Sequence, residues 1–149
     1  MLITPSVFLA AMLLITVLAA IAQWAVRRRQ MSHLRRLAAD ARMHFSAADR
    51  FRLAPRIASL LPVPGAAGVR VLDLIYGVER DRCRYVFTTD YTIGVLRTKT
   101  SMRRVVSYSE PRTSDGGAAA SPLVLAPESL STIEQYQHLL MTSASQQKT

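Results

Sequence analysis

The sequence is poor in the residues from which catalytic and cofactor sites are usually built. With one cysteine, Cys83, the chain cannot form an internal disulfide or supply the paired thiolates of a zinc ribbon or an iron–sulfur site. The histidines His33, His44 and His138 lie far apart, and none has a second ligand at metal-binding spacing. The sequence also contains no G-x-S-x-G elbow, phosphate-binding loop or H-E-x-x-H motif. We therefore predict no enzymatic activity, no catalytic residues, no metal site and no bound cofactor.

Aromatic and acidic residues are scarce as well. Only 7% of the residues are aromatic and 10 acidic residues stand against 19 basic ones, whereas 50% of the chain is hydrophobic. A chain of 149 residues is long enough for one domain of ordinary size and too short for a large two-domain enzyme. So much apolar content with so few aromatic residues indicates that the apolar residues are concentrated in one segment.

That segment is residues 7–26, VFLAAMLLITVLAAIAQWAV, which contain no charged residue. A helix rises about 1.5 Å per residue, so this run spans about 30 Å, the hydrocarbon thickness of a bilayer. The alternative is a cleaved signal peptide, for which residues 20–22 offer a small-x-small site. However, the positive charges follow the apolar run instead of preceding it, and the run is long for the core of a signal peptide. We predict an uncleaved transmembrane anchor over residues 1–26.

The residues that flank the anchor predict its orientation. No charged side chain precedes it, whereas an arginine-rich flank follows it. The positive-inside bias therefore places the N-terminus outside and the long C-terminal part in the cytoplasm, at the bacterial inner membrane. We assign the membrane interface to an amphipathic indole and the arginines after it, Trp24, Arg27, Arg28, Arg29, Arg35 and Arg36.

Residues 27–56 form a basic juxtamembrane region in which nine arginines stand against two aspartates. Because an anchor precedes this region, anionic lipid headgroups or acidic loops of a neighbouring subunit are nearer partners than nucleic acid, which we consider unlikely. Apolar positions on one helical arc of residues 31–45 predict an amphipathic helix, which lies either on the membrane surface or against the protein's own sheet. The capping-box pattern of residues 46–49 predicts a second short helix through about Arg52.

The remaining chain predicts a connector over residues 57–68 and a small α+β cytoplasmic domain over residues 69–141. The prolines and glycines of residues 55–68 break the helix. Period-two alternation then predicts two antiparallel strands, in residues 72–78 and 83–87, that are joined by a turn at residues 79–82. On the second strand, Cys83 shares a face with Tyr85 and Phe87, so a small core residue is the expected role for its thiol.

Further strands and one helix complete the predicted domain. We expect a third strand at residues 102–108, a loop at residues 115–120 and a short edge strand at residues 123–125. A capping box at residues 131–134 opens a C-terminal helix whose apolar side carries Ile133, Tyr136 and Leu140, and residues 142–149 form a frayed tail. The predicted fold class is thus α+β, with one N-terminal transmembrane helix, an amphipathic juxtamembrane helix, a small antiparallel sheet and a C-terminal helix.

Several segments resemble a group of bacterial single-pass membrane proteins that have a small cytoplasmic domain. The similar segments are the anchor with its arginines, RMHFSAADRF, the LLP of residues 60–62, and VLDLIYGVERDRCRYVFTTDYTIG, within residues 7–94. The group has no assigned activity. The resemblance therefore implies an architecture and supplies no catalytic residues.

Two classes of function remain open. The first is a non-catalytic accessory subunit of a larger integral-membrane complex, and photosynthetic or respiratory assemblies are the analogy. The second is a membrane-tethered binding or signalling module whose sheet recognises a soluble cytoplasmic partner. We take the first as the leading hypothesis.

The anchor offers one candidate face for docking on other integral-membrane subunits. Helices associate in a bilayer through close packing of small residues and through polar side chains. Thr16, Ala20 and Gln23 are spaced i, i+4, i+7 and share one face, which we predict to be the helix-docking surface. In the alternative reading, Thr16 bonds to its own helix backbone and Gln23 reaches the headgroups.

Overall fold

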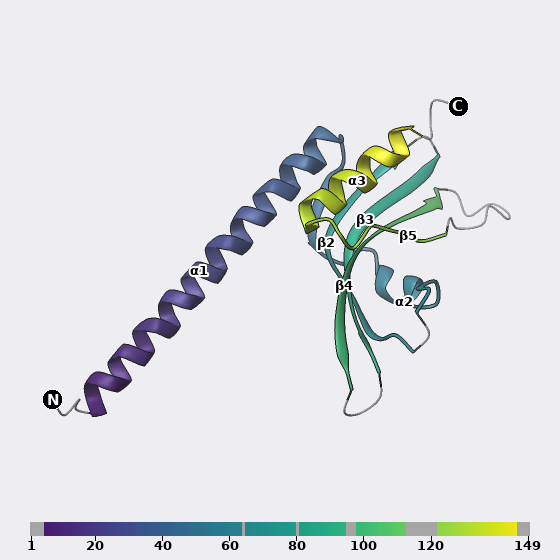
Figure 1. Ribbon diagram of the computed structural model, residues 1–149. Coiled ribbons are helices and arrows are strands. Elements are labelled where there is room, and N and C mark those ends of the chain that lie inside the picture. Colours follow the sequence, from purple (N-terminus) through teal and green to yellow (C-terminus); the bar gives the residue numbers. More distant parts are fainter. Residues whose placement is uncertain (1–4, 64, 80, 95–97, 113–121, 146–149) are drawn as a thin grey trace. The chain divides into compact units, whose positions relative to one another are not determined.

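The computed structural model describes residues 5–63, 65–79, 81–94, 98–112 and 122–145. Within these ranges the chain forms the helices and strands α1 (Pro5–Asp40), β1 (His44–Ala48), α2 (Leu53–Ala58), β2 (Ala67–Glu79), β3 (Arg82–Ile93), β4 (Thr100–Pro111), β5 (Val124–Leu125) and α3 (Thr132–Ser145), shown in Figure 1. This composition confirms the α+β class. The chain divides into two compact units, Met1–His33 and Leu34–Thr149.

The first unit is the apolar part of α1. Its large hydrophobic side chains are exposed throughout, and the most apolar 18-residue window has no buried residue. The helix is long and apolar enough to cross a membrane, although a signal sequence near an N-terminus has the same features. Because every residue of this run favours or tolerates a helix and no proline follows Pro5, nothing in the sequence ends the helix before the arginines.

The last turns of α1 belong to the second unit. Leu34 and Ala38 are buried in a cluster with Ile75 and Val86, so the predicted amphipathic stripe packs on the protein's own sheet. The predicted end at residue 45 is wrong, because α1 ends at Asp40.

A Schellman motif ends the helix. The Met43 N–H donates to the Ala38 carbonyl (2.7 Å), and the Arg42 N–H donates to the Ala39 carbonyl (2.9 Å). Arg42 has φ 55°, the left-handed conformation that this position needs. The reversed chain then enters β1, and Met43 packs so close to Gly77 that a Cβ there would lie 2.9 Å from the Met43 Cγ.

The second helix predicted after residue 45 is also placed wrongly. Residues 44–48 form β1, which pairs with β2. The acidic residue of the supposed capping box, Asp49, instead caps α2: its carboxylate accepts hydrogen bonds from the N–H groups of Leu53 (2.9 Å) and Ala54 (3.0 Å). Pro55, expected to break the helix, lies in the first turn of α2, where its missing N–H costs no hydrogen bond.

The five strands form one antiparallel sheet in the order β1-β2-β3-β4-β5. The structure confirms the predicted strand pair, the third strand and the short edge strand, although β2, β3 and β4 are longer than predicted. The predicted alternation in β2 breaks at Leu72, because a register shift lies between Leu72 and Ile75, and Asp73 has φ 51°. This bulge puts Leu72 on the same face as Ile75, whereas Leu74 and Tyr76 share the other face, as predicted.

Both faces of the sheet are covered, because neighbouring strand residues belong to different core clusters. Val86 belongs to the cluster formed with α3 and the end of α1, whereas Phe87 belongs to the cluster formed with α2. The two short helices therefore pack on opposite faces (Figure 1). Cys83 packs against the second cluster with Tyr85 and Phe87, which is the small core role expected for it.

The capping box of α3 is confirmed. The Ser131 N–H donates to Oε2 of Glu134 (2.8 Å), and hydrogen bonding from Ser131 lowers the pKa of the Glu134 carboxyl. The most buried residues of the helix are Tyr136, as predicted, and Leu139, which the pattern missed. The predicted tail from residue 142 begins too early, because α3 continues to Ser145. Residues 146–149 and the predicted loop at 115–120 lie outside the described residues.

Candidate functional site

The predicted helix-docking residues all lie on the exposed apolar part of α1. Thr16, Ala20 and Gln23 are exposed and share one face by their spacing. The Thr16 hydroxyl donates to the Met12 carbonyl (2.8 Å), as in the alternative reading. Its proton is therefore already used within the helix, so this face offers a neighbour small side chains, the lone pairs of Thr16 and the amide of Gln23.

The predicted interface residues fall into two groups. Trp24, Arg27, Arg28 and Arg29 follow one another on exposed turns of the first unit, and the guanidinium of Arg28 lies 5.1 Å from the centre of the Trp24 ring. Such a pair keeps the arginine charge close to the indole. A shallow hollow of about 370 Å³ lies beside the pair and is lined by residues of the same helix.

Arg35 and Arg36, the second group, belong to the second unit and have different surroundings. The guanidinium of Arg35 lies 5.8 Å from the centre of the Phe45 ring, which brings α1 and β1 together at this point. Arg35 lines an open hollow of about 500 Å³ between the last turns of α1 and β1, and two further basic side chains, His44 and Arg50, line it too. Arg36 is exposed and does not line it.

Sequence reasoning missed this meeting of basic residues. Residues 44–50 were expected to be helical, and a helix would have distributed His44 and Arg50 differently from a strand followed by a turn. Phe45 is the one residue of 44–48 with a strong preference for strands, and a single residue is too weak a signal to outweigh a capping-box pattern.

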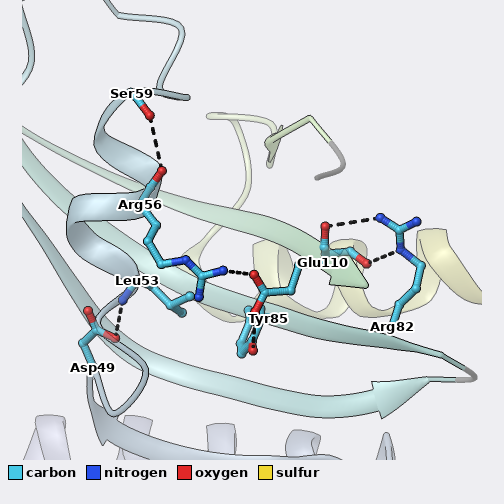
Figure 2. A network of polar contacts seen from close by, with 8 residues as sticks. Asp49, Leu53, Arg56, Ser59, Arg82, Tyr85 and Glu110 are labelled. Atoms are coloured by element: carbon cyan, nitrogen blue, oxygen red, sulfur yellow. Dashed lines mark hydrogen bonds and ion pairs between the residues drawn. The ribbon is translucent and has the colours of Figure 1, made fainter. Parts of the chain in front are cut away.

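A second polar cluster lies on the α2 face of the sheet, at the ends of β3 and β4 (Figure 2). Glu110 forms an ion pair with Arg56 of α2, and its Oε1 accepts a hydrogen bond from the Tyr85 hydroxyl (2.9 Å). On the other face of these two strands, Arg82 donates to the Ser109 hydroxyl (3.0 Å). Burial is the main cause that raises the pKa of Tyr85 to about 12, and interaction with Cys83 adds to it. The phenol therefore keeps its proton and serves as a donor. This cluster fastens α2 to the sheet.

A third set of polar contacts lies under α3 on the opposite face. The hydroxyl of Tyr136 donates to the Asp73 carbonyl (2.6 Å) at the β2 bulge and lies 2.9 Å from the Thr88 hydroxyl. Arg84 donates to the Leu139 carbonyl (2.5 Å) and pairs with Glu79 (3.5 Å). Burial lowers the pKa of Arg84, although Glu79 opposes that shift. These contacts hold α3 on the sheet.

Neither buried cluster has the composition of a metal site. Within the described residues, no group of three or more His, Cys, Asp or Glu side chains is placed to hold a metal ion. Comparison of the chain with protein-family models, with curated proteins and with solved structures finds no match. The candidate surfaces are therefore the exposed face of α1 and the basic hollow beside β1.

Proposed function

We propose that the chain is a non-catalytic accessory subunit of a larger integral-membrane complex. In this proposal α1 is an uncleaved anchor in the bacterial inner membrane, with its N-terminus outside and the sheet domain in the cytoplasm. Respiratory and photosynthetic assemblies are the kind of complex we have in mind. The observation that carries the proposal is the contrast in burial: no residue of the apolar window is buried, whereas the domain buries its own core.

An apolar helix without protein neighbours needs lipid, other helices or both. In lipid, leucine side chains gain little by moving to a protein interface, so a docking face is recognised by its small and polar residues. Thr16, Ala20 and Gln23 form such a face, whereas Leu14 and Leu18 lie on the other side.

Substitutions on matched faces test the docking surface. Ala20→Leu combined with Gln23→Leu should release the chain from its complex without preventing membrane integration, because the first change blocks close packing and the second removes the amide that bonds across the interface. Ala11→Leu, on the opposite face of the helix, is the control and should leave assembly intact. Purification in mild detergent, with identification of the co-migrating subunits, measures the result. Assembly that survives the double substitution would show that this face is not the docking surface.

Orientation is tested with a single exposed cysteine. Cys83 is half-buried, so we choose Val124→Cys, at a position 51% exposed, in a Cys83→Ser background. A membrane-impermeant thiol reagent should label this cysteine only after the spheroplasts are permeabilised. Labelling in intact spheroplasts would place the domain outside.

A membrane-tethered module that recognises a soluble partner is the second candidate, and it is favoured by the position of β1 at the edge of the described sheet, beside a basic hollow. Both candidates keep the anchor. Co-purification discriminates between them, because an accessory subunit brings integral-membrane subunits in fixed ratio and a tethered module brings a soluble protein.

A further inference from the structure

The edge of the sheet at β1 is open in the part of the chain that the structure describes. Among the described strands, β1 lies at the end of the order and pairs only with β2. Alternate residues of an edge strand direct their N–H and C=O groups away from the sheet, which makes such an edge a template for another strand. One carbonyl at its end is satisfied locally, because the Ser46 hydroxyl donates to the Ala48 carbonyl (2.9 Å).

The two edges of the sheet differ in how they are protected. Proteins commonly block an edge with a charged residue, a proline or a very short strand. At the far edge, β5 has two residues, and Pro127 follows closely after it. β1 has five residues, HFSAA, with neither a proline nor a formally charged Lys, Arg, Asp or Glu among them. The β1 edge therefore lacks the protection that the β5 edge has.

The hollow beside β1 is basic. The guanidinium of Arg35 lies over the Phe45 ring, 5.8 Å from its centre, and the residue is exposed. Among the described residues, neither Arg35 nor Arg50 forms an ion pair. The nearest acid along the chain, Asp49, uses both carboxylate oxygens to cap α2. Asp49 keeps its charge but forms no ion pair with either arginine among the described residues, so both guanidinium groups can pair with a ligand's carboxylates.

We propose that an extended acidic segment of a partner protein binds here as an additional strand on β1, with its carboxylates against Arg35 and Arg50. This inference rests on the proposed function and names the partner's chemistry at this surface. A peptide backbone supplies N–H and C=O groups to the open edge, and acidic side chains match the basic hollow. A lipid headgroup would supply an anion and would leave the edge unpaired. The peptide is therefore the occupant that both observations favour.

The test uses the full chain in nanodiscs of zwitterionic lipid and a short fluorescent peptide in which Glu alternates with Val. Anisotropy measures the affinity, and amide hydrogen exchange measures the protection of residues 44–48. Two control peptides separate the contributions: one has Lys in place of Glu, and the other has Pro in place of Val, which keeps the charge and prevents strand pairing.

We expect the Glu–Val peptide to bind and to slow amide hydrogen exchange at residues 44–48. We expect neither control peptide to do so. Arg35→Ser and Arg50→Ser should each weaken binding about fivefold, as for partly exposed charge pairs. Arg36→Ser, which changes a neighbouring arginine outside the hollow, should have no effect. Equal weakening by all three substitutions would show that the peptide responds to the overall positive charge and not to these two arginines, which would overturn the proposed site.

Two other outcomes also overturn the proposal. If the peptide does not bind but exchange at residues 44–48 slows when the nanodiscs contain anionic lipid, the hollow is a headgroup site. If neither peptide nor lipid slows exchange there, the edge binds no partner of these chemistries.

Failure here is distinct from failure of the accessory-subunit proposal. Assembly that is lost with Ala20→Leu and Gln23→Leu, yet is kept with Arg35→Ser and Arg50→Ser, would retain the subunit and reject the β1 site.

Discussion

Leucines in the two units of this chain have opposite surroundings. Leu13 of the apolar helix is 68% exposed, whereas Leu53 of the sheet domain is fully buried. A helix satisfies its backbone hydrogen bonds within its own segment and can therefore form with no protein neighbour. The sheet domain has to bring distant residues together, and its leucines are buried only once it has done so.

Polar side chains show the same difference. In the helix, Thr16 bonds to a carbonyl four residues away. In the domain, the Tyr136 hydroxyl bonds to a carbonyl 63 residues away and lies beside a hydroxyl 48 residues away. The single tryptophan is in the apolar helix and all five tyrosines are in the domain, so the two units can be followed separately by their spectra.

The largest expected effect is the loss of membrane integration by the first unit, with the second unit unchanged. Leu14→Arg combined with Leu18→Arg should abolish membrane integration, because each arginine near the centre of a bilayer costs about 2.5–3.5 kcal/mol. Extraction with alkaline carbonate measures integration, and Leu14→Ile with Leu18→Ile is the control. The near-ultraviolet circular dichroism of the tyrosines should stay unchanged. A lost tyrosine signal would show that the domain depends on the apolar helix.

The next largest effect is a loss of stability in the second unit, with the first unit unchanged. Leu53→Ala should lower the free energy of unfolding of the domain by about 2–5 kcal/mol, because it leaves a cavity among fully buried neighbours. Urea denaturation in mild detergent, followed by the tyrosine signal, measures the loss. Leu60→Ala, at a position 41% exposed, is the matched control and should change stability by less than about 0.5 kcal/mol. Similar losses at both positions would contradict the burial seen for Leu53.

A smaller loss should follow Tyr136→Phe, which removes one hydroxyl from under α3. It leaves the Asp73 carbonyl and the Thr88 hydroxyl without this partner and should cost about 1–2 kcal/mol. The same urea titration detects it, with the exposed Met141→Leu as the control.

Tyr136 also makes the stability of the sheet domain depend on pH. Burial raises the pKa of Tyr136, and the pKa of Tyr85 is about 12, whereas an unfolded tyrosine titrates near about 10. Above pH 10 the unfolded chain therefore binds fewer protons than the folded chain, so these groups stabilise the domain fully below about pH 10 and progressively less as the pH rises through their folded pKa values. Tyr136→Phe should make this alkaline loss shallower. An unchanged slope would show that Tyr136 does not contribute to it.

The smallest effect concerns the junction at which α1 turns into the sheet. Arg42→Gly should stabilise the domain by about 0.5–1 kcal/mol, because glycine adopts the left-handed conformation at the end of a helix without steric cost. Arg36→Gly, inside the same helix, should destabilise it by about 1 kcal/mol. Losses at both positions would argue that the side chain of Arg42 contributes more than its backbone conformation costs.

Local patterns determined much of this fold from the sequence alone. The apolar run of α1, the strand pair around residues 79–82 and the capping box of α3 each depend on residues a few positions apart, so their physical causes can be read in a short window. The candidate docking face of α1 is of this kind too, because helical spacing alone brings Thr16, Ala20 and Gln23 together.

Tertiary structure decided the features whose partners are distant in sequence. Residues 46–49 carry a helix-start pattern, yet residues 44–48 form β1 because β2 supplies a row of hydrogen-bonding partners for them. The bulge at Asp73 is matched by the Tyr136 hydroxyl, which no window around either residue contains. The hollow of Arg35, His44 and Arg50 exists only because α1 stops at Asp40 and the chain turns back beside it. For β1, pairing with distant residues outweighed a local preference of at most a few kcal/mol.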